Sequence, residues 1–188
     1  MANHRFVGPL SRFALEDATR PAAATDADLV SPPLVGMVSG PEPQRRLMEE
    51  ALIGCFSRDG RAAVVFSGSP HGTERRVGNV RVLPHAQDHQ IRHALLHADC
   101  IVCRSGYTSL MDLATLQISA VLVPTPGQPE QESLARHWEE HWGWTTVQQD
   151  QLAAFEPRRL EPHPVPLPVP AGEKWSWFED WLRHAPSP

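Results

Sequence analysis

From Leu34 onward, short apolar runs alternate with longer amphipathic stretches. The runs, which we predict as strands, are Leu34–Val38, Ala62–Phe66, Val80–Leu83, Cys100–Cys103, Ala120–Val123 and Thr145–Val147. The stretches that follow them, which we predict as helices, are Pro41–Phe56, Asp88–His97, Tyr107–Leu116, Glu130–His141 and Gln148–Phe155. Strands that are apolar throughout are expected when helices cover both faces of a parallel sheet. The alternation therefore predicts an α/β fold with a Rossmann-like, doubly wound parallel sheet.

The first predicted helix carries both a start signal and an apolar face. Pro41 follows a Ser-Gly turn and stands where proline is favoured, at the first helical position. Apolar residues then recur at spacings of three and four: Leu47, Met48, Ala51 and Leu52. This spacing predicts that one side of the helix packs on the sheet.

The two ends of the chain lack this alternation, so we divide the chain into three parts. Residues 1–33 show no periodicity and are predicted to be an N-terminal arm or interdomain linker. Residues 34–156 form the Rossmann-like domain. Residues 157–188 begin with alternating prolines, which exclude a helix or a central strand and predict an extended strap. After Gly172, apolar residues on one side predict a short C-terminal helix: Trp175, Phe178, Trp181 and Leu182.

Composition narrows the class of protein. A chain of 188 residues with 41% hydrophobic residues can bury one core. A net charge of -5 without a basic cluster argues against a nucleic-acid partner. We find neither an apolar run long enough for a membrane span nor a signal peptide, and three cysteines make no disulfide framework. We therefore expect a cytoplasmic protein.

Three junctions between a predicted strand and a predicted helix carry small or polar residues. They are Ser39 to Gln44, Cys103 to Asp112 and Pro124 to Glu132. In open parallel sheets, ligands bind beyond the carboxyl ends of the strands, where helix N-termini present unpaired N–H groups. Each junction is therefore either a plain turn or part of a ligand site. A carboxylate such as Asp112 can accept two hydrogen bonds from a ribose diol, or be an ordinary surface residue.

Taken together, the three junctions resemble the C-terminal, donor-binding half of GT-B glycosyltransferases, the glycosyltransferase family 28 C-terminal domain. Their order and their distances along the chain match, and the resemblance covers roughly Leu34 to Phe155. The Arg104-Ser105-Gly106 triplet with an acidic residue six positions after the glycine, and the Pro-Gly-Gln segment after the next strand, carry most of it. The segment from His4 to Leu10 also resembles the end of the interdomain linker.

The resemblance implies a role for each matching position. Small residues of the first junction would face the donor diphosphate, the loop with Leu83, Pro84 and His85 would read the uracil ring, and Asp112 would hold the ribose, where peptidoglycan-synthesising relatives have Glu. Polar residues of the third junction would contact the sugar, and Glu130 departs from the pair of Gln found in those relatives. The implied nucleotide-sugar site comprises Ser39, Gly40, Pro84, His85, Arg104, Ser105, Gly106, Ser109, Asp112, Gln128, Glu130 and Gln131.

The resemblance also implies what this half cannot do alone. In the GT-B architecture the acceptor site and the proposed catalytic base belong to the N-terminal domain, so we name no catalytic residue, no protein-bound metal and no cofactor. The expected function is binding of a UDP-sugar for transfer of a hexosyl or N-acetylhexosaminyl group, with an N-terminal acceptor domain or subunit as partner. One eukaryotic branch of the family is split in this way. The alternative is a noncatalytic nucleotide-sugar-binding or interaction subunit.

Other chemical signals have simpler interpretations. Four histidines recur every four residues, at His85, His89, His93 and His97, but no carboxylate or cysteine completes a metal set convincingly. Cys100 and Cys103 have redox spacing, yet in a strand their side chains point to opposite faces. All six Trp lie from Trp138 onward. We expect the first three to pack the last helix on the sheet and part of the others to dock on the partner domain.

Overall fold

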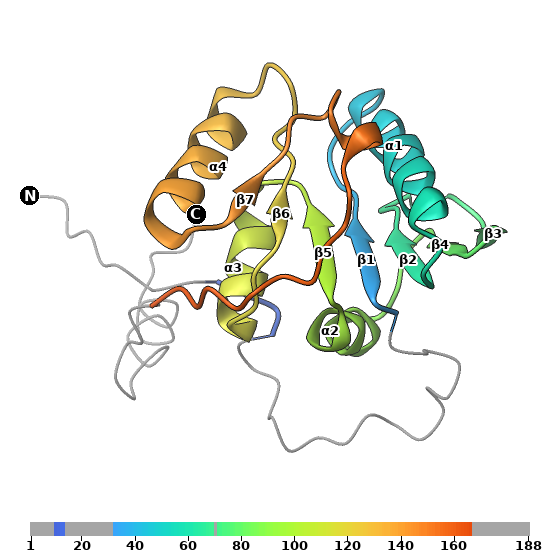
Figure 1. Ribbon diagram of the computed structural model, residues 1–188, viewed down its shortest axis with the longest axis horizontal. Helices are drawn as coiled ribbons and strands as arrows, with labels where there is room; N and C mark the ends of the chain where they lie inside the picture. The colour runs from blue at the N-terminus through green and yellow to red at the C-terminus, as the bar shows by residue number, and fades with distance from the viewer. Residues whose placement is uncertain (1–9, 14–31, 70, 167–188) are drawn as a thin grey trace, which may run out of the picture.

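The computed structural model describes residues 10–13, 32–69 and 71–166, and it contains one mixed sheet of seven strands. The strands are β1 (Leu34–Met37), β2 (Ala63–Phe66), β3 (Arg75–Val77), β4 (Val80–Leu83), β5 (Cys100–Cys103), β6 (Val121–Leu122) and β7 (Thr145–Thr146). Their order is β3-β4-β2-β1-β5-β6-β7, and Figure 1 shows them side by side in this order from right to left. Only β3 runs antiparallel to its neighbour within this sheet.

The helices in the described residues are α1 (Gln44–Asp59), α2 (Asp88–His97), α3 (Tyr107–Leu116) and α4 (Pro129–Trp142), with a short 3₁₀ turn, η1 (Leu152–Ala154). They cover both faces of the sheet. One core layer joins α1 and η1 to one face, with Phe56, Val65 and Leu152 at its centre. The other joins α2, α3 and α4 to the opposite face, with Leu95, Ile101 and Leu113. The sheet is therefore doubly wound, and the predicted fold class is confirmed.

Successive residues of the central strands alternate between the two layers. Cys100 and Val102 belong to the layer beneath α1, whereas Ile101 and Cys103 belong to the layer beneath α2 and α3. The two cysteines that have redox spacing thus lie on opposite faces of β5, as expected for a strand. Trp138 and Trp144 pack edge to face at 4.7 Å between α4 and the sheet, which confirms their predicted role.

The largest differences between the structure and the sequence pattern are in three elements, whereas several other boundaries differ by one or two residues. Helix α1 begins at Gln44 rather than at Pro41, because the chain needs Pro41 to Pro43 to turn from the end of β1. The predicted helix Gln148–Phe155 is only a turn followed by η1, because Leu152 alone is buried within it. Strand β3 was not predicted, because its residues Arg75 to Val77 are all exposed and carry no apolar run.

Parts of both chain ends pack against the domain. Phe13 is 4% exposed and Val165 5% exposed, and both belong to the layer of α2, α3 and α4. Leu160 donates its backbone N–H to the carbonyl of Asp99. The arm and strap predicted from the sequence therefore contribute to the core in the described residues. The predicted C-terminal helix around Trp175 lies outside the described residues.

Candidate nucleotide-binding crevice

The central strands β1 and β5 are neighbours, and the chain leaves them in opposite directions. From β1 it passes through α1 to β2, and from β5 it passes through α3 to β6 on the other side. Met37 and Cys103, the last residues of the two strands, are paired in register. Ligands of open α/β sheets bind at such a switch point, beyond the carboxyl ends of the strands. The turn after β1 and the turn after β5 therefore lie side by side at the switch point, and we call the space beyond them the crevice.

The turn after β1 is exposed and open. Ser39 and Gly40 are both exposed, and Gly40 has φ of 104°, a backbone conformation that side-chain-bearing residues rarely adopt. A Cβ built at Gly40 would meet no atom within 4 Å. Helix α1 follows this turn; its N-cap residue Pro43 makes no side-chain capping hydrogen bond, and the Glu42 carboxylate accepts one from the backbone N–H of Arg46 at 3.3 Å. The turn thus presents backbone that a ligand can approach closely.

Arg104 lies below the crevice rather than in it. Its side chain is among the largest that are fully buried. Its guanidinium donates to the backbone carbonyls of Val123 and Pro124 at 3.3 Å, and to that of Gln44 at 2.8 Å. It also donates to Oε1 of Gln149 at 2.5 Å. Burial lowers the pKa of Arg104 to about 10, so the group stays protonated at neutral pH. Arg104 therefore holds three loops of the crevice together as a buried cation.

The residues after Arg104 form the start of α3. Ser105 is buried, and its Oγ donates to the backbone carbonyl of Gln131 at 2.8 Å. Gly106 is the N-cap residue in an extended conformation, and no side chain of the described residues caps the helix there. Ser109 is half-buried one turn later, and Tyr107 is 50% exposed at the first helical position. The first N–H groups of α3 therefore have no capping side chain among the described residues.

The third junction is tied together by its own side chains. Gln131 accepts a hydrogen bond from the backbone N–H of Thr125 at 3.0 Å and donates one to Oε1 of Gln128 at 2.7 Å. Glu130 is exposed in the first turn of α4. The two glutamines thus shape the loop, while the Glu130 carboxylate faces solvent.

On the other side of the crevice, the loop between β4 and α2 carries Pro84, which is half-buried, and His85, which is exposed. The backbone carbonyl of Pro84 accepts a hydrogen bond from Ser69 N–H at 2.8 Å. The loop ends at Asp88, the first residue of α2. Asp88 and Asp112 are brought together by one side chain, that of Arg12.

Asp112 is buried and already has partners. Its Oδ1 accepts a hydrogen bond from Ser11 Oγ at 2.8 Å, and its Oδ2 pairs with Arg12 Nε at 2.9 Å. The sequence analysis did not single out Ser11 or Arg12, because the arm lacks periodicity and lies about a hundred positions from Asp112 in the chain. Only a Ser-Arg pair next to a linker-like Gly-Pro-Leu segment hints at polar contacts there.

A further cleft opens beside the crevice, on the side of α1. Its volume is about 540 Å³, and it is lined by Leu47, Pro126, Gln148, Gln149 and Asp150. Gln149 links the cleft to the crevice, because its Nε2 donates to Oε1 of Gln44 at 2.7 Å while its Oε1 accepts from Arg104. The sequence analysis did not place this segment in the site, because the pattern of residues 148–155 indicates a helix. The signal that could have found it is its position after the carboxyl end of β7.

Within the described residues, no group of three or more His, Cys, Asp or Glu side chains has the arrangement of a metal site. The rings of His93 and His97 lie in contact, tilted by 34°, with their centroids 4.3 Å apart. None of the helices in the described residues is long and apolar enough to cross a membrane.

A doubly wound α/β sheet with open glycine turns at its switch point is the architecture of nucleotide-binding domains. Residues 72–161 match the family model described as the glycosyltransferase family 28 C-terminal domain. No curated protein matches the chain.

The solved structures that resemble the chain include two glycosyltransferase structures. One is the crystal structure of Acinetobacter baumannii MurG, with 20% identity, a TM-score of 0.47, and coverage of 72% of this chain and 44% of that chain. The other is described as the glycotransferase of kitacinnamycin, with 22% identity, a TM-score of 0.50, and coverage of 79% and 38% respectively. The second likeness supports the α/β fold. The chain spans less than half the length of either protein.

Proposed function

We propose that this domain binds the donor of a glycosyltransferase reaction, a UDP-sugar, in the crevice between β1 and β5. The observation that carries the proposal is the pairing of Met37 with Cys103 at the ends of the two strands. Neighbouring strands lie about 4.8 Å apart, so the open Gly40 turn and the uncapped start of α3 emerge side by side. The match of residues 72–161 to the glycosyltransferase family 28 C-terminal domain supports donor binding as the function.

The electrostatics of the crevice favour the diphosphate. The uncapped N-terminus of α3 presents backbone N–H groups and the positive end of the helix dipole. Beneath it lies the Arg104 guanidinium, which makes no ion pair with a carboxylate of the described residues. A buried cation without an acidic partner attracts an anion placed above it more strongly than a surface cation does. Gly40 would let the diphosphate approach the backbone of the first turn.

The other groups of the site would hold the nucleoside and the sugar. We assign the ribose to Asp112 and the uracil ring to the loop with Pro84 and His85. The sugar would meet the start of α4, where the exposed Glu130 carboxylate can accept a hydrogen bond from a hydroxyl. Gln128 and Gln131, which bond one another, would hold that loop in place.

Donor binding is only one part of a glycosyl transfer reaction. Transfer of a sugar to an acceptor hydroxyl requires stabilisation of the leaving diphosphate and removal of a proton. The described crevice offers groups for the first task. We therefore propose that an N-terminal acceptor-binding domain or subunit supplies the second, and that the chain does not turn over donor without it.

Calorimetric titration with UDP, UDP-N-acetylglucosamine, ADP and GDP tests the proposal, together with the variants Gly40→Ala and Gly60→Ala. Both glycines have positive φ and open surroundings, but Gly60 ends α1 at its far end. We expect the uridine ligands to bind selectively, and Gly40→Ala to weaken them about tenfold while Gly60→Ala leaves them unchanged. Absence of binding by all four at millimolar concentration would reject the function. Uridine binding without turnover, even when an acceptor domain is supplied, would favour the noncatalytic subunit.

A further inference from the structure

We propose that Ser11 and Arg12 form a latch over the nucleoside side of the crevice, and that a nucleotide must displace them to reach Asp112. The inference rests on the proposed function, because it takes Asp112 as the group that holds the ribose. It adds a form of self-inhibition to that site.

The latch supplies Asp112 with the same contacts that a ribose would make. Ser11 Oγ donates to one carboxylate oxygen at 2.8 Å, and Arg12 Nε donates to the other at 2.9 Å. The two hydroxyls of a ribose diol would likewise give one donor to each oxygen. The arm and the ribose therefore compete for one pair of acceptors.

Burial makes the competition exclusive. The Asp112 side chain is only 2% exposed, so a ligand cannot reach its oxygens while the covering groups stay in place. The Arg12 side chain is 36% exposed, so it can leave toward solvent without disrupting the core. Displacing Arg12 costs little only because the ribose hydroxyls would replace its hydrogen bond to the buried Asp112 carboxylate.

Arg12 also contacts helix α2, on the other side of the position proposed for the nucleoside. Its Nη1 pairs with Asp88 Oδ1 at 2.9 Å, at the first residue of α2 and directly after the loop assigned to the uracil ring. One side chain thus bridges α2 and α3 across the space that the nucleoside would fill. Release of Arg12 would remove this bridge and free the carboxylates of Asp88 and Asp112.

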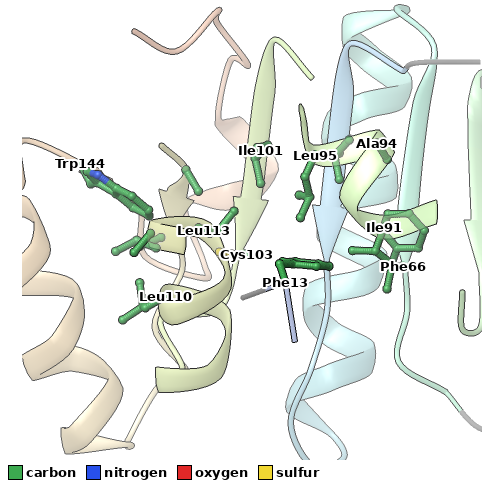
Figure 2. Packing of buried hydrophobic residues seen from close by; sticks show 14 of the residues in the cluster. Phe13, Phe66, Ile91, Ala94, Leu95, Ile101, Cys103, Leu110, Leu113 and Trp144 are labelled. Carbon is green, nitrogen blue, oxygen red and sulfur yellow. The ribbon is translucent and has the colours of Figure 1, made fainter. Parts of the chain in front are cut away.

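Phe13 keeps the latch in place between binding events. Figure 2 shows its ring between Cys103 and Leu110 on one side and Phe66 and Ile91 on the other, and only 4% of the residue is exposed. The Phe13 N–H donates to Ser11 Oγ at 3.1 Å, which fixes the turn that presents Ser11. An anchored segment acts at high effective concentration, so it competes with a free nucleotide even though each contact is weak.

The test is a titration of the full chain with UDP, with Arg12→Ala, the Ser11→Ala/Arg12→Ala double variant, and Arg76→Ala as the matched control. Arg76 loses the same charge but lies on the exposed edge strand β3. We expect Arg12→Ala to bind UDP about threefold to tenfold more tightly than the natural chain, and the double variant to bind at least as tightly. The control should bind like the natural chain. Hydrogen exchange gives a second measurement: saturating UDP should speed exchange at the Phe13 amide.

The outcomes separate the latch from the function. If the natural chain binds UDP and Arg12→Ala binds it equally or more weakly, with exchange at Phe13 unchanged or slowed, Arg12 is a fixed part of the site and the latch is wrong, while the proposed function stands. If neither the natural chain nor the double variant binds UDP, the proposed function fails and the latch fails with it. Tighter binding by Arg12→Ala with faster exchange at Phe13 supports both.

Discussion

The Nη2 of Arg104 donates a hydrogen bond to the backbone carbonyl of Gln44 at 2.8 Å, and so ties the end of β5 to the first residue of α1. The two residues stand on opposite sides of the switch point. The position of the first turn relative to α3 therefore depends on one buried side chain.

Arg104→Ala should lower the free energy of unfolding by about 3 kcal/mol, because it leaves several buried carbonyl groups without donors. Arg104→Lys should lower it less, since it keeps the charge but reaches fewer partners. Urea denaturation measures both, with Arg58→Ala as the control, because Arg58 is exposed in the last turn of α1. A loss no larger than that of the control would contradict the bracing role.

Gly68→Ala should lower the stability of the domain next to the first turn of the crevice. Gly68 has φ of 59°, and a Cβ there would lie 2.7 Å from the carbonyl oxygen of Val38, next to the first turn. Gly78→Ala is the matched control, because Gly78 has φ of 58° but nothing within 4 Å. Thermal denaturation should show a loss of about 1 to 2 kcal/mol for the control, from the backbone conformation alone, and a clearly larger loss for Gly68→Ala. Equal losses of stability for the two variants would contradict this expectation, because they would mean that the Val38 carbonyl moves away from the added Cβ without cost.

Phe13→Ala should cost about 3 kcal/mol of stability, since it empties a core position. Leu10→Ala, three residues earlier, should change stability little, because Leu10 is 53% exposed. Chemical denaturation of the two variants checks whether the arm belongs to the folded domain. Wild-type stability in Phe13→Ala would show that the segment does not pack there.

The buried thiols should make the domain sensitive to alkali. Burial raises the pKa of Cys100 and that of Cys103 to about 12, from an ordinary value of 9.0. Between these values the unfolded chain has released thiol protons that the folded chain retains, so unfolding becomes more favourable as the pH rises. Stability should be unaffected by these groups below pH 9 and fall between about 9 and 12.

The Cys103→Ala variant isolates this effect. Between pH 9 and 11 its stability should decline less steeply than that of the natural chain, by up to about 1.4 kcal/mol per pH unit. At pH 8 the native thiols should react with a thiol reagent only when the chain unfolds, because all three cysteines are buried. Parallel pH profiles for the two proteins would show that burial of Cys103 does not perturb its titration.

The strands and most helices could be predicted because burial on both faces leaves uninterrupted apolar runs. Val80 to Leu83 and Cys100 to Cys103 were predicted with the boundaries that the structure has. Strand β3 could not be found in this way, because an exposed edge strand built from Arg75, Arg76 and Val77 needs no apolar residues. The chain from Gln148 to Phe155 has apolar residues three apart, which a helix and a packed turn share.

From the sequence, the candidate site could be predicted only as a set of junctions between strands and helices. That Ser39, Gly40 and Gly106 lie at strand ends follows from the alternation of elements. The pairing of Ser11 with Asp112 does not, because it joins positions 101 residues apart through side chains that follow no period. The burial of Arg104 could not be foreseen either, since an arginine without an acidic partner is expected at the surface.

The position of bound nucleotide tests the central claim most directly. Titration of isotope-labelled protein with UDP, followed by amide NMR shifts, should move the signals of Gly40, Gly106 and Tyr107 most, with smaller changes around Ala86. Signals at Gly60 and Gly78, which lie on other parts of the surface, should stay in place. Shifts gathered at Gln148 to Asp150 instead, or none at saturating UDP, would contradict a nucleotide site between β1 and β5.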